Sequence, residues 1–374
     1  MSGRPLALSV IMPARNEAET LPWSLAALLR SDLPRQAWEL IVVDDASSDA
    51  TAEVARRYAD RVIELPGPRP FGPAYGRNRA AAAARGEILV FIDADVCVHR
   101  DTLRRFADLF RDDPNVGAAF GSYDANPTAP GLVSQYRNLL HHHVHQRSGG
   151  DADTFWAGCG AVRRNVFVEA DMFDEWHYSR PQIEDIELGA RIRSLGHRIV
   201  LRPEIQATHR KRWTLGAVIR TDLLDRGVPW TRLLVQRGSV MRTATLNLKR
   251  VEKVKTVLVW GAVACATVAL PTRDWRWLIA ATVLLLVVIA GSAGVYACFA
   301  RVRGLWFALA TIPLQLLYYL TNGVSVGMGW LVHHTVGEPR PDPLIEAYTE
   351  VGVVLDPPLP SRRRRDPWRE TATP

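Results

Sequence analysis

A change in composition near residue 250 limits what this chain can fold into more than any other feature of its sequence. Residues 1–250 are charged and rich in turn-forming residues, as in a soluble domain. Beyond them lie three uncharged runs, Thr256–Pro271, Trp277–Ala300 and Gly304–Val332. A helix needs about 20 apolar residues to cross a bilayer, and such uncharged runs are rare inside soluble domains. The C-terminal third is therefore predicted to be an α-helical membrane domain with two to four crossings, about three by the number of runs.

The basic residues around these runs predict their orientation. Four cations precede the first run: Lys249, Arg250, Lys253 and Lys255. Arg301 and Arg303 separate the second run from the third. Because basic loops stay on the cytoplasmic side, both places are assigned to the cytoplasm. No short apolar segment follows Met1, so we expect no cleaved signal peptide. The protein is thus predicted to be integral to the cell inner membrane, with its charged N-terminal part in the cytoplasm.

The orientation rule leaves one conflict. Three crossings would place the C-terminal tail outside, although that tail carries Arg362–Arg365. Either the tail is an exception or one run does not cross. The third run is the best candidate for a break or a re-entrant segment, because it contains several residues that interrupt helices. They are Pro313, Asn322, Gly323, Gly327 and Gly329.

Four segments are expected along the chain. A soluble cytoplasmic domain covers 1–212, and amphipathic interfacial helices cover 213–252. Transmembrane helices occupy 253–333, and a proline- and arginine-rich tail, 334–374, is expected to be disordered. Within the second segment, tryptophans and leucines are interleaved with arginines. This pattern is typical of helices in the membrane interface, although packing on the soluble domain is an alternative.

Three apolar runs in the soluble part are predicted strands of one doubly wound α/β sheet. They are Ala7–Met12, Leu40–Val43 and Ile88–Ile92, and a predicted helix, Leu21–Leu29, follows the first. The third run is apolar on both faces, as in the centre of a covered parallel sheet. Ligands of such sheets bind at the carboxyl ends of the strands. A nucleotide could lie at this edge, against the backbone near Pro13, the pair Asp44–Asp45, and Asp93.

Asp93 and Asp95 follow the third strand one residue apart. Along an extended chain alternate side chains lie on the same side, so both carboxylates would reach one hard cation. Mg²⁺ or Mn²⁺ holding a diphosphate would fit such a pair. An ordinary polar turn after a buried strand is the other interpretation, which this segment alone does not exclude.

The segment Gly72–Arg79 is a candidate for meeting the diphosphate charge. Neither a GxGxxG turn nor a GxxxxGK[ST] loop is present, which argues against a dinucleotide cofactor and an ATP-hydrolysing core. Instead, a glycine-rich turn leads into an alanine-rich helix with Arg77 and Arg79 near its start, where the helix dipole favours anions. Solvent-facing arginines on a surface helix would look the same in sequence.

These motifs, in this order, resemble those of the family 2 glycosyltransferases with the GT-A fold. The resemblance rests on Pro13–Glu17, Val43–Thr51, Arg77–Asn78 and Asp93–Asp95, and it covers about the first 100 residues. It implies that 1–212 is a GT-A (Rossmann-like) nucleotide-sugar transferase domain, followed here by the α-helical membrane domain. It also implies an inverting enzyme that transfers the sugar in a single displacement.

The resemblance implies roles for the residues at the strand ends. The nucleotide-sugar donor, a UDP- or GDP-sugar, would be bound by Pro13, Ala14, Arg15, Glu17, Asp44, Asp45, Arg77, Asn78 and Asp93. One of the two aspartates after the second strand would contact the base. Asp95 would be the main ligand of Mn²⁺ or Mg²⁺, and Asp93 would bind the ribose or share the metal. His209 could be a further metal ligand.

The proton of the acceptor hydroxyl requires a second acidic site, which the sequence offers at Glu184–Asp185. The segment Pro181–Leu188 is similar to the Glu-Asp motif that ends the catalytic half of these enzymes. Asp185 is our candidate for the general base, and Glu184 is the competing candidate. An acidic first helical turn, favoured by the helix dipole, would explain both carboxylates without catalysis.

Acceptor-side residues are expected upstream of this motif. The segment Phe155–Arg164 resembles the acceptor-side strand of the same family. Gly158 and Gly160 would let the backbone approach a sugar. Trp156 could stack on that sugar or pack in the core.

Downstream, Arg212 and Trp213 are also expected on the acceptor side. They end a variant of the Gln-x-x-Arg-Trp motif of processive polysaccharide synthases, with His209 in place of glutamine. This departure, and the expectation that no span precedes the domain, favour transfer of a single sugar.

The predicted function is transfer of a sugar to a lipid-like or membrane-associated acceptor, such as polyprenyl phosphate, by a membrane-anchored, metal-dependent hexosyltransferase. A nucleotidyltransferase of similar topology and a non-catalytic nucleotide-sugar binder are the alternatives. The net charge of +7 fits anionic lipid head groups, and no nucleic-acid motif is present. One histidine cluster shows no closed metal-ligand set and receives no role: His141, His142, His143 and His145.

Overall fold

The computed structural model of the chain describes residues 7–238, 246, 249–337, 339–343 and 345. It divides into two compact units. The first comprises residues 1–128, 148–211 and 338–374, and the second comprises residues 129–147 and 212–337. Residues 346–374, which include Arg362–Arg365 and most of the tail predicted to be disordered, lie outside the described part, as do 239–245 and 247–248.

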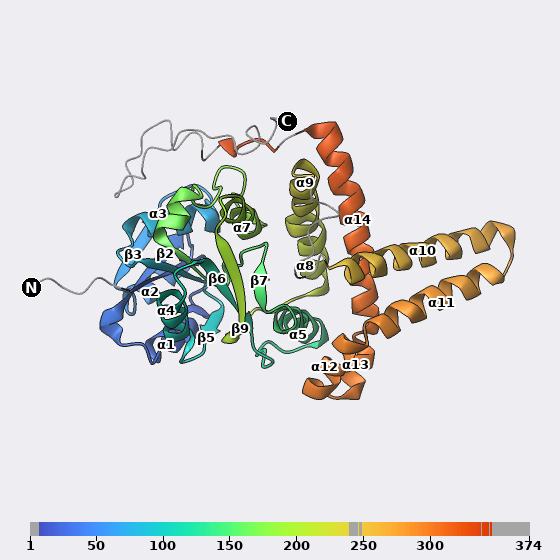
Figure 1. Ribbon diagram of the computed structural model, residues 1–374, viewed down its shortest axis with the longest axis horizontal. Helices are drawn as coiled ribbons and strands as arrows, with labels where there is room; N and C mark the ends of the chain where they lie inside the picture. Colours follow the sequence, from blue (N-terminus) through green and yellow to red (C-terminus); the bar gives the residue numbers. More distant parts are fainter. Residues whose placement is uncertain (1–6, 239–245, 247–248, 338, 344, 346–374) are drawn as a thin grey trace, which may run out of the picture. The chain divides into compact units, whose positions relative to one another are not determined.

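A nine-stranded mixed sheet forms the centre of the first unit (Figure 1). Its strands follow the order β3-β2-β1-β4-β8-β6-β9-β5, and β7 pairs with β9 off this path. They are β1 (Leu8–Ala14), β2 (Trp38–Asp45), β3 (Arg61–Leu65), β4 (Ile88–Ile92), β5 (Val96–Val98), β6 (Val116–Tyr123), β7 (Gly150–Ala152), β8 (Cys159–Arg163) and β9 (Arg198–His209). The predicted α/β class is confirmed.

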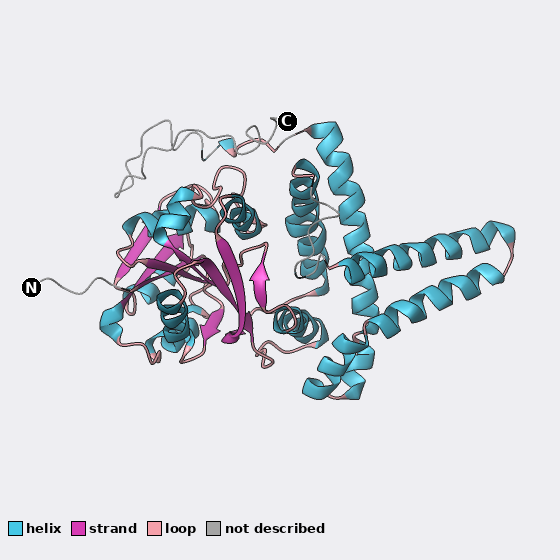
Figure 2. Cartoon of the chain, viewed as in Figure 1, coloured by secondary structure: helices cyan, strands magenta, loops and turns pink. Residues whose placement is uncertain are grey.

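Helices flank this sheet (Figure 2). They are α1 (Leu21–Leu29), the short 3₁₀ helix η1 (Arg35–Ala37), α2 (Thr51–Arg56), α3 (Pro73–Ala83), α4 (Thr102–Asp112), α6 (Arg164–Glu169) and α7 (Glu184–Ser194). The predicted helix α1 is confirmed with its expected bounds. Leu21, Leu25 and Leu28 recur at helical spacing and are fully buried in the core. Burial of each such side chain is worth roughly 1.5–3 kcal/mol.

The half of the sheet from β3 to β4 is parallel and contains the three predicted strands. β1 pairs with both β2 and β4, and β2 pairs with β3. Every residue of β2 and β4 is buried, because both faces of the sheet are covered, and this explains their continuous apolar sequences. The carboxyl ends of β1, β2 and β4 meet at one edge, which carries Pro13, Asp44, Asp45 and Asp93.

Beyond β4 the sheet departs from the predicted parallel arrangement. β8 runs antiparallel to β4 and β6, and β5 runs antiparallel to β9. β5 has three residues and starts directly after Asp95, so its sequence has no periodicity that distinguishes it from a turn. Val96 pairs with His209 in the β5–β9 register. This pairing places His209 beside Asp95.

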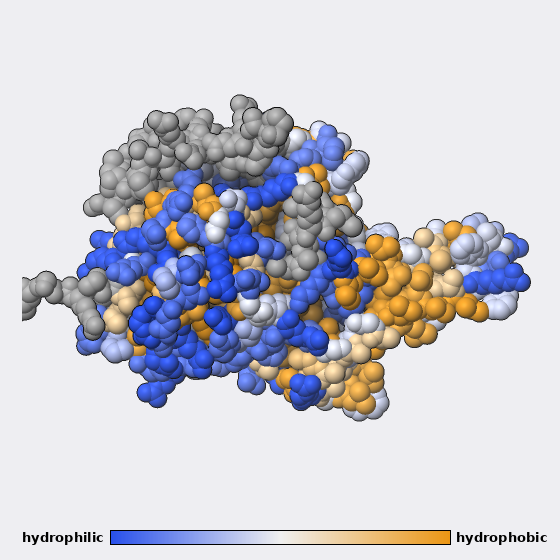
Figure 3. All heavy atoms as spheres, viewed as in Figure 1, coloured by the Kyte–Doolittle hydropathy of each residue, from blue (hydrophilic) through white to orange (hydrophobic). Residues whose placement is uncertain are grey.

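The second unit is helical. It consists of α5 (Leu132–Gln146), α8 (Leu215–Arg220), the π-helical segment η2 (Thr221–Gly227), α9 (Val228–Gln236), α10 (Arg250–Thr272), α11 (Arg276–Gly291), α12 (Ala293–Arg303), α13 (Leu305–Ala310) and α14 (Ile312–Val336). α10 and α11 pack together as a hairpin (Figure 1). The hairpin surface is largely apolar (Figure 3). Its exposed side chains include Val257, Trp260, Leu270, Leu278 and Val283.

The described helices fit the lower end of the predicted two to four crossings. α10 is the one described helix long and apolar enough to span a bilayer by itself, and α11 with α12 passes the same test only as a pair bent by 58°. The second predicted run is therefore interrupted at Ser292, and the third is interrupted at Thr311. Pro313 lies in the first turn of α14, where its missing N–H has no helical partner to lose. At most two candidate spans are present in the described residues, against about three predicted.

Candidate active site

The loops that follow β1 and β2 are held together by hydrogen bonds. Asn16 Oδ1 accepts from the backbone N–H of Ser48 (2.9 Å), and the Asn16 N–H donates to Ser47 Oγ (3.0 Å). The N–H of Glu17 donates to Thr51 Oγ1 (2.8 Å). Asn16 has a φ of 53°, in the left-handed region that asparagine tolerates better than most residues. The two motifs thus form one rigid corner at the sheet edge.

Asp44 and Asp45 are both buried, but their surroundings differ. The Asp45 carboxylate accepts from the N–H groups of Phe71 and Gly72, each at 2.8 Å. Burial raises the pKa of Asp45, although these two bonds and the charge of Arg15 oppose the shift. Oδ1 of Asp44 is buried and has no hydrogen-bond partner among the described residues. Asp45 therefore holds the loop before α3, and Asp44 is better placed to accept from a ligand.

Asp93 and Asp95 lie in a turn, not in an extended segment. β4 ends at Ile92, and the N–H of Val96 donates to the Asp93 carbonyl (3.0 Å) as the chain turns into β5. The strand alternation that was expected to align the two carboxylates is therefore absent. Burial raises the pKa of Asp93, and the charge of Asp95 adds to this shift while Arg77 opposes it.

Arg77 connects the two acidic motifs. Its Nη2 donates to Asp93 Oδ1 (2.7 Å), and its Nη1 donates to Glu184 Oε1 (2.9 Å). Burial disfavours the guanidinium charge, but the carboxylates of Asp93, Glu184 and Asp185 outweigh it and raise the pKa of Arg77. The hydrogen bonds of this side chain are thus made to carboxylates, where the sequence suggested a diphosphate.

Asn78 and Arg79 fix the loop that precedes α7. The Asn78 side chain has no exposed surface. It accepts from the Phe173 N–H (3.0 Å), donates to the Phe173 carbonyl (2.9 Å) and donates to Glu175 Oε2 (2.6 Å). Arg79 lies over the ring of Tyr75 and donates to Glu175 Oε1 (3.3 Å). These contacts give both residues a structural role next to the site.

Asp95 and His209 face each other at the ends of their segments. His209 Nε2 lies 3.5 Å from Asp95 Oδ2. The imidazole stacks on the ring of Tyr123, with centroids 4.2 Å apart and planes 8° from parallel. Burial would raise the pKa of Asp95, but His209 and Lys211 lower it to about 2. Asp95 is therefore ionised at neutral pH, beside an imidazole nitrogen.

This pair fits the protein side of a divalent metal site. A separation of 3.5 Å suits two atoms that bind one ion at about 2.1 Å each. A carboxylate oxygen and an imidazole nitrogen together suit Mn²⁺. Within the described ranges no group of three or more His, Cys, Asp or Glu side chains could hold a metal. Two protein ligands leave the remaining positions of such a metal to a phosphate-bearing ligand and to water.

The structure separates Glu184 from Asp185 by environment. Glu184 is buried, and its Oε2 accepts from the Gln182 N–H (2.9 Å) while Oε1 binds Arg77. Asp185 is half-buried at the start of α7. Its Oδ2 accepts from the Ala157 N–H (3.1 Å). Both oxygens of Glu184 are therefore engaged in a buried ion pair and a hydrogen bond. Asp185 instead lies beside Ala157, in the segment predicted to be on the acceptor side.

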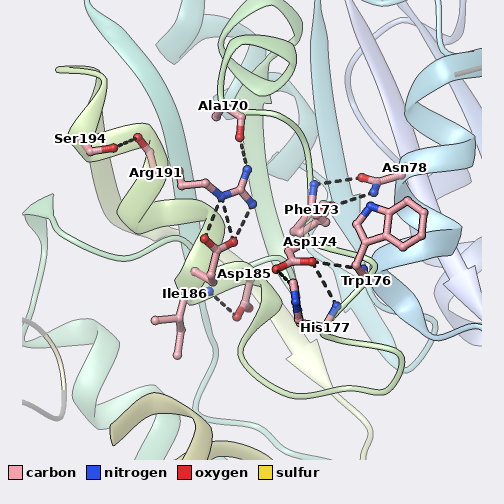
Figure 4. A network of polar contacts seen from close by, with 11 residues as sticks. Asn78, Ala170, Phe173, Asp174, Trp176, His177, Asp185, Ile186, Arg191 and Ser194 are labelled. Atoms are coloured by element: carbon pink, nitrogen blue, oxygen red, sulfur yellow. Dashed lines mark hydrogen bonds and ion pairs between the residues drawn. The ribbon is translucent and has the colours of Figure 1, made fainter. Parts of the chain in front are cut away.

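A polar network holds the start of α7 in place (Figure 4). Arg191 donates to the Glu187 carboxylate at 2.8 Å from Nε and 2.6 Å from Nη2, and also to the Ala170 carbonyl. Asp174 Oδ2 lies 2.8 Å from His177 Nδ1. The loop between α6 and α7 is thereby tied at several points, and this fixes the helical turn that carries Asp185.

Gly158 and Gly160 are explained by packing. A Cβ at Gly158 would lie 2.6 Å from the Trp156 indole, and one at Gly160 would lie 2.3 Å from the Trp156 carbonyl oxygen. Trp156 is half-buried and packs edge-on against Tyr123 at 4.7 Å. Both positions therefore require glycine because a side chain would collide with Trp156, which explains them without a bound sugar.

Arg212 and Trp213 belong to the second unit. The backbone N–H of Trp213 donates to Ser134 Oγ (2.7 Å) at the start of α5. The guanidinium carbon of Arg137 lies 5.7 Å from the centroid of the Trp213 ring. The histidine cluster of residues 141–145 also lies on α5 and in this unit.

Two residues of the site were missed in the sequence. Tyr123 ends β6 and supports His209, and Lys211 lowers the pKa of Asp95. Lys211 stands two residues after His209, and this spacing at the end of a strand was a usable signal. Nothing local in the sequence marks Tyr123.

The chain is similar in sequence and in fold to several known proteins. Residues 9–170 match the family model described as Glycosyl transferase family 2. Glycosyltransferase AglE of Haloferax volcanii is 35% identical over 101 residues, which is 26% of this chain and 33% of AglE. A 4,4'-diaponeurosporenoate glycosyltransferase of Staphylococcus haemolyticus is 39% identical over 93 residues, 24% of each protein. The match to this family covers less than half of the chain, in its N-terminal part.

The sequence relatives share only part of their length with this chain. Poly(ribitol-phosphate) beta-N-acetylglucosaminyltransferase TarS of Staphylococcus aureus is 31% identical over 99 residues, 26% of this chain and 17% of TarS. Among solved structures, the mannosyltransferase PcManGT of Pyrobaculum calidifontis, in complex with GDP-Man and Mn²⁺, is similar with a TM-score of 0.50 at 20% identity. That match covers 90% of this chain and 91% of PcManGT. It supports the GT-A-like fold.

Proposed function

We propose that this protein is a membrane-anchored, inverting, metal-dependent glycosyltransferase that moves one sugar from a nucleotide-sugar to a lipid-like acceptor. The observation that carries the proposal is the bridge from Asp93 through Arg77 to Glu184, which sets the strand-end acidic motif beside the motif that contains Asp185. A single displacement needs this arrangement, with a donor site and a proton acceptor facing each other across the reacting carbon.

The donor would lie across the carboxyl ends of β1, β2 and β4. Asp44 would accept from the base, because its buried oxygen is available while Asp45 holds the loop before α3. Pro13, Ala14, Arg15 and Glu17 would line the same corner. A UDP- or GDP-sugar meets these requirements, since uracil and guanine both present ring N–H donors.

Asp95 and His209 would hold Mn²⁺ or Mg²⁺, with Asp93 at the ribose or near the metal. When bound, the metal would neutralise the diphosphate leaving group. PcManGT, which shares the fold, binds GDP-Man together with Mn²⁺. This chain contributes an ionised Asp95 with a pKa of about 2 and the imidazole 3.5 Å from it.

Asp185 would be the general base. It would take the proton of the acceptor hydroxyl as the acceptor oxygen bonds to the anomeric carbon and the bond to the diphosphate breaks. The electron pair of that bond leaves with the nucleoside diphosphate. The partial exposure of Asp185 supports this assignment over Glu184, whose carboxylate is closed in the pair with Arg77.

The acceptor would be a membrane lipid alcohol or a polyprenyl phosphate. The apolar α10–α11 hairpin supports membrane anchoring, and an anchored enzyme meets acceptors that are confined to the bilayer. Trp156 is the candidate for acceptor contacts in the first unit.

The test is turnover of UDP- and GDP-sugars by the purified full-length protein, with Mn²⁺, with Mg²⁺ and with a chelator. We expect release of the nucleoside diphosphate that requires the metal and increases when polyprenyl phosphate is added. Nucleotide binding without release in every condition would identify a non-catalytic binder. Release of inorganic pyrophosphate from a nucleoside triphosphate and a sugar phosphate would identify a nucleotidyltransferase.

A further inference from the structure

We propose that the α10–α11 hairpin crosses the bilayer out and back, and that it is the only part of the described chain that crosses. The inference rests on the membrane anchoring proposed above and goes beyond it, because it sets the number of crossings at two. It implies that every described segment after the hairpin lies on the same side of the membrane as the catalytic unit. Three observations support it: the contacts of the two ends of the hairpin, the contacts of α14, and those of residues 339–345.

Both ends of the hairpin meet the C-terminal end of α5. Lys249 Nζ, just before α10, donates to the Arg147 carbonyl (3.1 Å). At the start of α12, a Cβ on Gly294 would lie 3.2 Å from Arg147 Nη1. α5 is joined at both ends to segments of the first unit, so it cannot cross a membrane without splitting that unit. The chain therefore leaves from and returns to one side.

α12 remains against α5 after this return. The ring of Phe299 packs edge-on against Tyr136, with centroids 5.9 Å apart. Arg303 Nε donates to Gln135 Oε1 (2.9 Å). The 58° bend between α11 and α12 is where the path changes from crossing to lying beside α5.

α14 cannot serve as a third crossing, because it packs against η2 and α9, which contain charged residues. Near its start, Tyr136 OH on α5 donates to Gln315 Oε1 (3.0 Å). Further along, Ser325 Oγ donates to the Asp222 carbonyl (3.0 Å), and the Gly337 carbonyl after its end accepts from Arg232 Nη2 (2.5 Å).

Carrying α14 across the bilayer would carry residues 220–232 with it. That segment contains five charged residues: Arg220, Asp222, Asp225, Arg226 and Arg232. Each charge at the bilayer centre costs about 2.5–3.5 kcal/mol even on the mildest scale. Such a cost excludes α14 from the hydrocarbon core.

The chain after α14 is back in the first unit. The Asp342 N–H donates to the Trp176 carbonyl (2.8 Å), and the Asp342 carboxylate pairs with Arg69. Ile345 is fully buried. Residues 148–211, which precede the helical segment 212–337 in the sequence, and residues that follow it therefore belong to the same compact unit. The chain between them must cross the membrane an even number of times.

The hairpin has the dimensions and charges of two short spans. α10 has 23 residues and α11 has 16, about 35 Å and 24 Å of helix. α11 alone is therefore shorter than a hydrocarbon core of about 30 Å, a mismatch that local thinning of the bilayer accommodates. Its base is polar: Glu252 accepts from Lys255 Nζ (2.9 Å) and from Tyr319 OH (2.7 Å). Lysines at such a level can extend their charge into the interface. The tip carries Arg273, Asp274 and Arg276, and the positive charge is greater at the base.

The test is cysteine labelling in intact cells that produce the full-length chain. The background lacks the native cysteines: Cys97, Cys159, Cys265 and Cys298 are replaced by alanine. Single cysteines are introduced as Arg273→Cys at the tip, Trp306→Cys on α13 and Arg340→Cys after α14. Trp306 is 82% exposed, so labelling at this position reports its side of the membrane.

We expect a membrane-impermeant maleimide to label R273C in intact cells. We expect it to label W306C and R340C at least tenfold more strongly after permeabilisation than before. Labelling of W306C or R340C in intact cells would overturn the proposal, as would protection of R273C. Alkaline extraction separates the two failures. If the chain stays in the membrane but R273C is protected, membrane anchoring is supported and the two-crossing topology is wrong. If the chain is extracted, membrane anchoring itself is wrong. If the cysteine-free background fails to fold, the native chain serves as background, and its own labelling is subtracted.

Discussion

Arg77 and Glu184 are 107 residues apart in the sequence and form a buried ion pair, with Nη1 2.9 Å from Oε1. Their side chains are 5% and 6% exposed. The same guanidinium binds Asp93 at 2.7 Å. Because Glu184 directly precedes Asp185, this one side chain determines how far the strand-end carboxylates lie from the proposed base.

Arg77→Leu should destabilise the fold by about 3 kcal/mol, because it leaves the buried Glu184 carboxylate without its partner. Arg56→Leu is the matched control, since the pair Arg56–Glu64 is 54% and 53% exposed and should cost less than about 1 kcal/mol. Urea unfolding measures both. In the Arg77→Leu background, Glu184→Leu should recover part of the loss. Equal losses for the two arginines would contradict the prediction.

Asp185→Asn should lower turnover by about 10²–10⁴-fold while nucleotide affinity stays unchanged, because the amide cannot accept the acceptor proton. Glu184→Gln should lower it much less, since the amide oxygen can still accept from Arg77. Single-turnover rates and equilibrium nucleotide binding measure the two effects. Full turnover in Asp185→Asn would reject this residue as the base.

Gly72→Ala should disrupt the loop that binds Asp45. Gly72 has a φ of +94°, and a Cβ there would lie 2.4 Å from the Ser179 carbonyl carbon. Gly131→Ala is the control, with a φ of +92° and nothing within 4 Å, so it should cost only the conformational term of about 1–3 kcal/mol. We expect a larger loss of unfolding free energy in Gly72→Ala, together with weaker nucleotide binding. Equal losses would contradict the prediction, because they would show that the Ser179 backbone moves away from the added Cβ at little cost.

Tyr123→Leu should weaken Mn²⁺ binding about tenfold, because the His209 ring loses the flat surface that orients it, and supporting residues of metal ligands typically have effects of this size. Tyr123→Phe keeps the stacked ring and should retain near-normal affinity. Titration of Mn²⁺ in the presence of a nucleoside diphosphate measures this. If both variants bind Mn²⁺ equally well, His209 is not oriented by the stack.

The His99 imidazole should titrate above its usual pKa of 6.5, chiefly because Asp124 Oδ2 lies 2.8 Å from its Nε2. The stabilisation from the charged ring is then fully present below about pH 6.5 and is lost as the pH rises through the raised value. An NMR titration should show the His99 pKa falling towards 6.5 in Asp124→Asn. The same pKa in both proteins would show that the carboxylate does not set it.

Sequence patterns predicted the α/β class, the helix α1 and the position of the carboxylates at the strand ends. These features follow from local order: a strand buried on both faces must be apolar throughout, and the first polar residue after it marks its end. The family motifs are also local. For these reasons Pro13–Glu17, Asp44–Asp45 and Asp93–Asp95 could all be found by inspection.

Contacts between distant segments could not be predicted in this way. The family resemblance favoured Asp185 over Glu184, but local sequence gave no physical reason for the choice, because both stand in the first turn of one helix. The ion pair of Glu184 with the buried Arg77 supplies that reason. The pairing of β5 with β9 that brings His209 to Asp95 depends on a strand too short to show a period. The contacts of α14 with residues 220–232 and of Asp342 with the first unit are likewise long-range, and they are the basis for proposing one membrane hairpin in place of three crossings. Composition determines which segments avoid water, whereas the packing of polar groups determines which of them the bilayer must cover.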